Sequence, residues 1–487
     1  MTNQQSSSQL ALTELQAAQS QSARTHSAQS QSAQSQSTSA LVLTEAMTGI
    51  SSPSPLQYAF KTKTGPHAGR GGQPPLPPAQ AQQKLTELLQ QPAAQVEQSE
   101  QALPRALYLH IPFCRVRCSF CNFFQYASSP KMMASYFEQL LQELSLKAKQ
   151  PWTQSQPFDA IYIGGGTPTD LTADQIFELG QALRSQLPLR EDCEITLEGR
   201  LNKFNAHKFQ RALDGGFNRF SFGVQSFDTH VRKAAKRLDN RETLLAQLKD
   251  LTSEPSSTIA IDLMYGLPHQ TTQSWQQDLE DTVASGVDGV DLYQLIGFQG
   301  TAIQRDLEAG RLAPLMESPE RALLYRQGAE FLNTAGFHRL SYCHWASSDK
   351  ERSRYNSLAK SGAEILAVGA GAGGNIGGFG YMQPRDIEPW QQRLEAGEWP
   401  IGMMMAKSPS HLQDAAIVGA CDRGIISSEL LGNKKFEHAI PLFAAWQENG
   451  LATLESDKVT LTLAGQFWSV NMANGLLAYL NENPIAV

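Results

Sequence analysis

The sequence has few charged residues and no long apolar run. Charged residues make up 18% of the 487 residues, and the formal net charge is −7. A chain with this balance has no basic surplus that would hold nucleic acid by bulk electrostatics. No stretch reaches the roughly eighteen consecutive apolar residues that a membrane-spanning helix requires. We therefore expect neither a nucleic-acid partner nor a membrane span.

Cysteine is also scarce. The chain has six cysteines, and three of them lie in one short run, so they do not form the disulfide framework of small secreted proteins. The amino terminus lacks the basic segment and apolar core of a secretory signal. These absences predict a reducing, cytoplasmic location. Cys193, Cys343 and Cys421 lie far apart, and we expect them to be buried thiols without a special role.

Composition divides the chain into four segments. Residues 1–51 are rich in Ser, Gln and Ala, and they carry too little apolar surface to offset the entropy of ordering, which predicts a disordered leader. Residues 52–105 are rich in Pro, Gln and Gly and are expected to be extended, with a short helix around Gln83–Leu89 and a role as a substrate lid. Residues 106–339 are predicted to form the main domain, and residues 340–487 a smaller α+β accessory domain.

Apolar runs alternate with helical patterns in the main domain. Six such runs that alternate with helices predict a parallel sheet with helices outside, and right-handed crossovers curl the sheet into a partial (β/α)₆ barrel of the TIM type. The expected strands are Ala106–Ile111, Asp159–Ile163, Glu194–Leu197, Arg219–Val224, Ile259–Leu263 and Val290–Leu295. The expected helices are Lys131–Lys149, Thr172–Gln186, Asn205–Leu213, Asn240–Leu251 and Thr272–Ser285.

Three cysteines follow the first expected strand with unequal spacing. Cys114, Cys118 and Cys121 form a C-x₃-C-x₂-C run, and Phe123 stands where a further thiolate could follow. A closed zinc site or an ordinary [4Fe–4S] cluster needs four ligands. Three thiolates on a four-iron cube would leave one iron open to a small molecule. Zinc that is completed by a distant His or Cys is the alternative reading of the spacing.

A glycine-rich turn follows the second expected strand. Gly164–Thr169 reads Gly-Gly-Gly-Thr-Pro-Thr, and bare backbone there can approach a polar ligand closely. Glu198 and Gln225 follow the third and fourth strands, and Asp262 lies at the end of the fifth. Chemistry in α/β barrels gathers at the carboxyl ends of strands, so these positions are expected to meet at one barrel mouth. Any one of these polar residues alone is more typical of a helix cap or a solvated loop.

The cysteine run and the glycine turn together resemble the radical S-adenosylmethionine (SAM) superfamily. Gly216–Phe227 and Asp262–Pro268 narrow the resemblance to the branch of oxygen-independent coproporphyrinogen III oxidase, over about residues 108–374. The resemblance implies a [4Fe–4S] cluster on Cys114, Cys118 and Cys121, with SAM on the open iron. Carried over by position, the residues expected to contact SAM are Tyr108, Phe120, Gly165, Gly166, Thr167, Glu198, Gln225, Arg237 and Asp262.

Other segments of the sequence bear on the identity of the substrate. Phe123 replaces a cysteine of the oxidase pattern, and Pro53–Pro74, Asn122–Tyr126 and Glu198–Arg200 resemble the heme-utilisation radical SAM methyltransferases, the anaerobilin synthase family. That resemblance implies methylation and anaerobic opening of heme with release of iron, two SAM molecules per turnover, and a low-potential electron donor such as flavodoxin or ferredoxin. A heme chaperone and a coproporphyrinogen III oxidase are the alternatives.

Two histidines are candidate substrate residues. His344 could bind heme iron or donate a proton, although a structural histidine held by ordinary hydrogen bonds is the more common case. His67 lies in Gly- and Pro-rich sequence that offers no core, and it could belong to a lid. No catalytic residue beyond the cluster is assigned.

Overall fold

The computed structural model describes residues 41–64, 73–92, 103–123, 125–297 and 299–485, and the elements below lie in the compact unit Leu43–Val487. Most of the predicted leader and His67 lie outside the described residues. The prediction of disorder was wrong at the end of the leader, where α2 (Glu45–Thr48) forms. This short helix is held by tertiary contacts, since Met47 is buried and its carbonyl accepts a hydrogen bond from the Trp446 indole.

Six parallel strands follow one another along the central sheet in chain order. The middle residues of these strands are mostly apolar and buried, as is typical of parallel strands that are covered on both faces of the sheet. The two outermost strands of the whole sheet, β14 (Met403–Ala406) and β9 (His338–Arg339), do not pair with each other, so the barrel stays open and the predicted partial barrel is confirmed. The strands are β1 (Arg105–Ile111), β4 (Phe158–Gly165), β5 (Leu189–Gly199), β6 (Arg219–Gln225), β7 (Thr258–Tyr265) and β8 (Gly289–Gln294).

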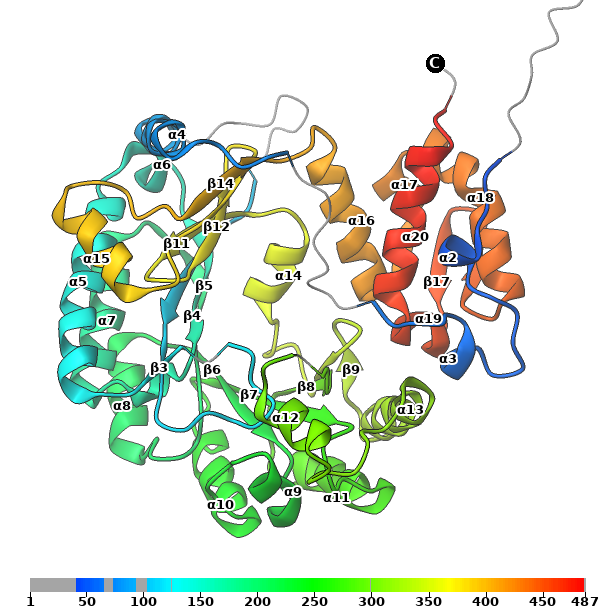
Figure 1. Cartoon of the computed structure of the whole chain (residues 1–487), viewed down its shortest axis with the longest axis horizontal. Coiled ribbons are helices and arrows are strands. Elements are labelled where there is room, and N and C mark those ends of the chain that lie inside the picture. Colours follow the sequence, from blue (N-terminus) through cyan, green and yellow to red (C-terminus); the bar gives the residue numbers. More distant parts are fainter. Residues whose placement is uncertain (1–40, 65–72, 93–102, 124, 298, 486–487) are drawn as a thin grey trace, which may run out of the picture. The chain divides into compact units, whose positions relative to one another are not determined.

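Helices cover the outer face of this sheet, as Figure 1 shows. Polar caps set where several of them begin. The Thr172 hydroxyl accepts from the Gln175 amide at the start of α7 (Ala173–Gln186), and Asn205 and Asn240 cap α8 (Ala206–Gly215) and α10 (Arg241–Thr252). The crossover helices are α5 (Pro130–Ala148), α7 (Ala173–Gln186), α8 (Ala206–Gly215), α10 (Arg241–Thr252), α11 (Thr272–Ala284) and α13 (Ser318–Thr334), with the short α9 (Thr229–Ala234) and α12 (Ala302–Glu308) near the mouth.

The sheet extends beyond the predicted six strands at both edges. β11 (Glu364–Val368) runs parallel to β1, although it comes from the predicted accessory segment, and β12 (Gly373–Ile376), β13 (Phe379–Met382) and β14 (Met403–Ala406) continue from it. At the other edge β10 (His344–Ala346) pairs antiparallel with β8, and β9 (His338–Arg339) pairs with β10. Helix α14 (Arg354–Lys360) contacts β1 and β4 and lies on the concave side of the sheet (Figure 1).

The C-terminal elements combine helices with a small sheet, as the sequence predicts for residues 340–487. α16 (His411–Arg423) and α18 (Asn433–Glu448) contact a three-stranded sheet, and α20 (Ser469–Glu482) packs on both helices. The sheet consists of β15 (Ile425–Ser427), β16 (Ala452–Leu454) and β17 (Lys458–Leu461). Two N-terminal helices, α3 (Pro55–Tyr58) and α2, pack on this part. Further along, α4 (Pro78–Gln90) is longer than the predicted helix and contacts β14. Among the described helices, none is both long and apolar enough to cross a membrane.

Candidate metal and cofactor site

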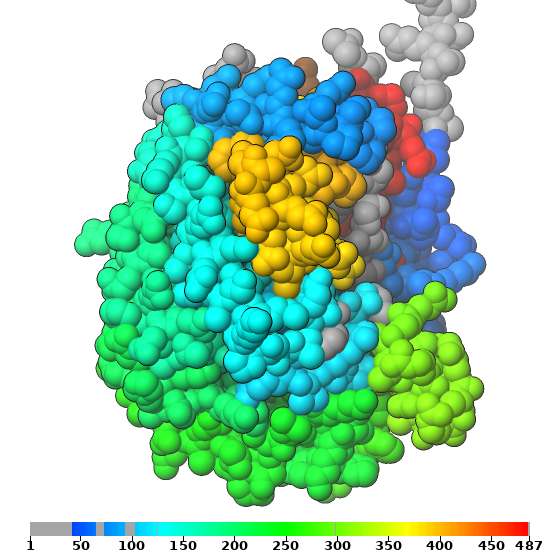
Figure 2. Space-filling model, turned by 60° about the vertical axis from the view of Figure 1, so that its left-hand side comes forward, coloured from blue at the N-terminus to red at the C-terminus, as the bar shows by residue number. Residues whose placement is uncertain are grey.

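The loop after β1 carries the three cysteines at the mouth of the barrel. Cys114 and Cys118 are buried and Cys121 is partly exposed. The short strand β2 (Phe113–Cys114) pairs with β3 (Tyr126–Ala127), which ties the start of the loop to its end. On the face seen in Figure 2 the cyan segment, which includes this loop, meets the yellow-orange segment near residue 390, where the Tyr126 hydroxyl donates to Asp386 at 3.2 Å.

Cationic and hydroxyl donors surround two of the sulfur atoms. Arg200 and Arg237 each place a guanidinium nitrogen 3.3 Å from Cys118 Sγ, and Thr167 Oγ1 lies 3.2 Å from Cys114 Sγ. Burial opposes ionisation of Cys118, but the two guanidinium groups outweigh it and lower the pKa of the thiol. Burial raises the pKa of Cys114. Because iron binds the thiolate, this donor set suits a negatively charged iron–sulfur group.

The three thiols are not gathered around one point. Among the described residues, no three His, Cys, Asp or Glu side chains converge as a single metal ion requires. In a four-iron cube each cysteine binds a different iron, so the cysteine sulfur atoms are farther from one another than ligands of one metal ion. Cys114, Cys118 and Cys121 would hold the predicted cluster, each through its thiolate.

The glycine turn after β4 packs directly on the cysteine loop. The Gly166 amide donates to the Ile111 carbonyl at 2.8 Å, and a β-carbon at Gly166 would lie 2.4 Å from the Phe113 carbonyl oxygen. Gly165 has φ +117°, a conformation that side chains oppose. Bare backbone is thus required here for the turn and the cysteine loop to touch.

Two carboxyl groups lie in the barrel beside this turn. Burial raises the pKa of Glu198 to about 8, and the nearby Asp262 adds to the effect. Burial also raises the pKa of Asp262, together with the charge of Asp291. A β-carbon at Gly164 would lie 2.6 Å from Glu198 Oε2, so the carboxyl sits against the glycine turn. Carboxyl groups that are buried in this way can bind a ligand's ammonium group or its hydroxyls.

The remaining predicted cofactor residues surround the same mouth. Gln225, at φ +72°, and Arg237 both place nitrogen atoms over Gly223, at the end of β6. The Tyr108 ring stacks on Tyr162, and its hydroxyl lies 2.9 Å from His110 Nδ1. Phe120 packs against a small apolar cluster of Val231, Leu267, Leu295 and Ile303. The fold thus brings the predicted cysteine, glycine and polar residues to one end of the sheet.

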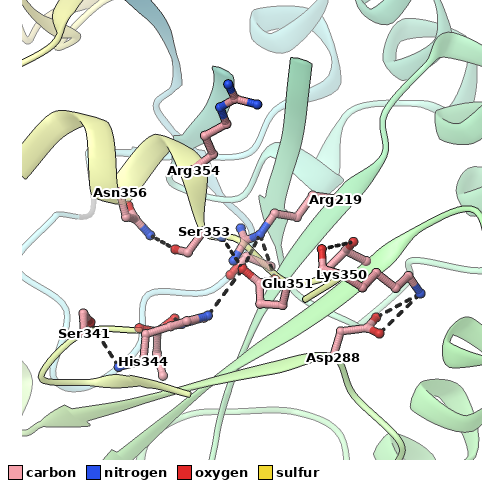
Figure 3. Close-up of polar contacts among 12 residues, drawn as sticks. Arg219, Asp288, Ser341, His344, Lys350, Glu351, Ser353, Arg354 and Asn356 are labelled. Carbon is pink, nitrogen blue, oxygen red and sulfur yellow. Dashed lines mark hydrogen bonds and ion pairs between the residues drawn. The ribbon is translucent and has the colours of Figure 1, made fainter. Parts of the chain in front are cut away.

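His344 lies deeper in the barrel, between two carboxylates. Its Nδ1 is 2.7 Å from Asp291 and its Nε2 is 3.3 Å from Glu351, as Figure 3 shows for the second contact. Burial opposes protonation, but the Asp291 carboxylate outweighs it and raises the pKa of His344 to about 10. An imidazolium has no lone pair for iron. This geometry supports the structural alternative for His344 rather than a heme ligand.

Glu351 also pairs with Arg219 at the opposite end of the barrel. Their side chains are buried, with Arg219 Nε 3.0 Å from Glu351 Oε2 (Figure 3). Burial alone would raise the pKa of Glu351, but Arg219 and His344 lower it to about 2. The network ties the loop before α14 to β6 and β10.

Replacing Glu351 with Gln should destabilise the protein by about 3–5 kcal/mol, because it leaves a buried guanidinium without its counter-charge. The exposed pair Arg311–Asp306 provides the control, and Asp306→Asn should cost under about 1 kcal/mol. Since the pKa of Glu351 is lowered from 4.5 to about 2, its contribution is complete above pH 4.5 and is lost as the pH falls through 2. Denaturant unfolding at several pH values measures this. Equal losses for the two variants would contradict the role of Glu351.

Several site residues were missed from the sequence. The sequence marks Arg200 only as the end of the segment Glu198–Arg200, and its contact with Cys118 depends on the fold. Tyr162 was also missed, and it joins Tyr108 and Tyr355 in an aromatic group with ring centroids 4.8–6.4 Å apart. One signal in the sequence could have indicated the buried ion pair of Arg219 and Glu351, because an arginine at the start of an apolar strand needs a partner.

Comparisons with known proteins show the family to which the chain is similar. The radical SAM superfamily profile matches residues 108–282. Anaerobilin synthase of Escherichia coli O157:H7 is 36% identical, over 80% of this chain and 88% of that protein. Heme chaperone HemW of Synechocystis sp. is 30% identical, over 60% of this chain and 71% of that protein. The structure of coproporphyrinogen III oxidase from Escherichia coli superposes with a TM-score of 0.69 at 22% identity, over 82% of this chain and 93% of that one.

Proposed function

The chain belongs to the radical SAM superfamily, in its coproporphyrinogen III oxidase-like branch, and we propose that it methylates heme and opens the macrocycle without oxygen. The observation that carries this proposal is the 36% identity to an anaerobilin synthase over 80% of the chain. The products would be iron and a linear tetrapyrrole, and two SAM molecules would be used per turnover.

The chain's own residues would bind and orient the cofactors. Bound together, the cluster and SAM supply radical chemistry and a one-carbon unit. Arg200 and Arg237 donate N–H groups toward Cys118 Sγ and so stabilise its thiolate. Glu198 and Asp262 would bind the amino group or hydroxyls of SAM, and Phe120 with its apolar neighbours would exclude water.

The interior of the barrel has aromatic side chains that suit a flat aromatic substrate. Tyr108, Tyr162 and Tyr355 form a wall of rings beside Glu198, and ring faces of this kind pack on planar groups. An electron would come from a low-potential carrier of the flavodoxin or ferredoxin class.

Two related activities are the alternatives. A heme chaperone would bind heme unchanged, and a coproporphyrinogen III oxidase would decarboxylate its own substrate to protoporphyrinogen. Phe123, which stands where the oxidase pattern has another cysteine, is 61% exposed beside the cluster loop and brings no thiol there. This departure counts against the oxidase alone. The reaction on heme is favoured over the chaperone because identity to an anaerobilin synthase is 36% over 80% of this chain, compared with 30% over 60% for a heme chaperone.

Anaerobic incubation of the reconstituted protein with heme, SAM and a low-potential reductant tests the proposal. We expect progressive loss of the heme Soret band that depends on SAM and on the reductant, because the conjugated macrocycle is opened. Omitting SAM is the control. Unchanged heme that passes to an acceptor protein would establish the chaperone instead, and protoporphyrinogen formed from coproporphyrinogen would establish the oxidase.

A further inference from the structure

A cavity of about 330 Å³ lies beside β8, apart from the cysteine loop. Asp291 and Tyr293 of β8 form one wall, and the segment 340–344 that leads into β10 forms another. Helix α14 and the end of α16 close the remaining sides. This volume is at the lower end of the roughly 300–1,000 Å³ of small-molecule pockets, so part of a large ligand fits in it.

Helix α14 presents two different faces. Tyr355 and Leu358 pack on the buried residues Ala106, Ala160 and Ile365 at the base of the barrel. The residues that face the cavity recur every three or four positions, as one face of a helix requires, and all are polar: Ser353, Asn356, Ser357 and Lys360. The apolar face explains why the helix docks on the barrel. The polar face has no packing role of this kind and suits a polar ligand.

The cavity lining carries more positive than negative charge. Its two carboxylates already have cationic partners, since Asp291 lies 2.7 Å from His344 and Asp422 lies 2.9 Å from Lys360. Two arginines add further positive charge. Arg352 forms an ion pair at 3.0 Å with Asp192, which does not line the cavity. Arg423 donates a hydrogen bond to the neutral Ser361 hydroxyl at 3.4 Å.

Two tyrosines contribute aromatic rings to the lining. The Tyr342 ring lies 5.4 Å from Lys360 Nζ, and Tyr293 forms part of the wall nearest the cofactor site. Asp291 is the register partner of Asp262 on the neighbouring strand β7, so the cavity and the predicted SAM residues share the barrel interior. A ligand held here by one edge can extend toward Asp262.

We propose that this cavity binds the carboxylate-bearing edge of the tetrapyrrole substrate. Arg423 supplies the cationic contact, the hydroxyl and amide groups of Ser357 and Asn356 on α14 supply hydrogen bonds, and Tyr293 and Tyr342 contact the rim of the ring. The inference rests on the proposed function, because it assigns a place to the substrate of that reaction. It also predicts that the protein distinguishes porphyrins with free propionate groups from porphyrins without them, because the cavity recognises the propionate groups of heme.

The test compares hemin with its dimethyl ester, which lacks the two negative charges. Each is titrated anaerobically into the cluster-reconstituted protein, and Soret absorbance gives the Kd. Ser357→Asp places a carboxylate in the cavity, and Ser357→Asn is its neutral control of the same shape. We expect Ser357→Asp to bind hemin about tenfold more weakly than Ser357→Asn, and both variants to bind the ester equally. Arg423→Gln should weaken hemin binding by about three- to tenfold, whereas Arg393→Gln on α15 (Ile387–Glu395) should change nothing.

The outcomes separate this inference from the proposed function. If hemin is bound and consumed while the Asp and Asn variants behave alike, the assignment of the cavity is overturned and the reaction stands. Equal binding of hemin and its ester by the wild-type protein would also overturn it. If hemin is neither bound nor consumed, the proposed function itself fails. Circular dichroism of each variant verifies that its fold is unchanged.

Discussion

Cys118→Ala is expected to abolish cluster binding and product formation together. Cys118 is the central ligand of three, so its loss leaves two thiolates for a four-iron group. It also leaves Arg200 and Arg237 facing a methyl group in place of a thiolate 3.3 Å away, which adds unpaired positive charge at the site. Iron and acid-labile sulfide content after anaerobic reconstitution, and consumption of heme, are the measurements.

Cys193→Ala is the matched control for that variant. Cys193 is also a buried thiol, but it lies in β5 and outside the cysteine loop. The control should keep full iron content and lose at most about 1 kcal/mol of stability, because only one small group is removed from the core. A Cys118→Ala protein that retains a full cluster, or that still consumes heme, would refute the cluster assignment.

Gly166→Ala is expected to have the second largest effect. A methyl group there would lie 2.4 Å from the Phe113 carbonyl oxygen, and backbone atoms cannot turn away as a flexible side chain does. The glycine turn must then separate from the cysteine loop. Overpacking of this kind costs about 1–3 kcal/mol, so SAM affinity should fall by roughly ten- to a hundredfold. Equilibrium binding of SAM to the reconstituted protein measures the change.

Gly373→Ala is the control for the glycine variant. A β-carbon at Gly373 would meet its nearest neighbours at 3.9 Å, an ordinary contact distance, and the residue lies in β12 away from the cysteine loop. This variant should bind SAM normally. Equal SAM affinity of the two variants would show that the tight contact between the turn and the loop does not shape the cofactor site.

The barrel was predictable because its signals are local. Each of the six strands is an apolar run between helical patterns, and the structure places all six within a few residues of the predicted bounds. The extension through β11 to β14 was not predicted. Gly369–Gly378 reads as a turn-rich segment, and the sheet continues there because β11 pairs with β1 and β12 to β14 follow β11. The same holds for α2, which depends on Trp446, almost four hundred residues later.

The site was predictable only in part. The cysteines and glycines form contiguous motifs, whereas the environment of His344 comes from separate segments. Its partners Asp291 and Glu351 lie 53 and 7 residues away, and no spacing in the sequence shows that both carboxylates face one ring. The contacts of Tyr108, Gln225 and Arg237 with SAM stay predictions, as do the domain boundaries at residues 51, 105 and 339.

The central claim is that this protein opens heme with a carbon taken from SAM. Mass spectrometry of the tetrapyrrole product, after anaerobic reaction with SAM labelled with deuterium in its methyl group, tests that claim most directly. We expect a linear, iron-free tetrapyrrole that carries the labelled carbon, with free iron released in equal amount. Recovery of intact heme, or of an opened product without the label, would contradict it.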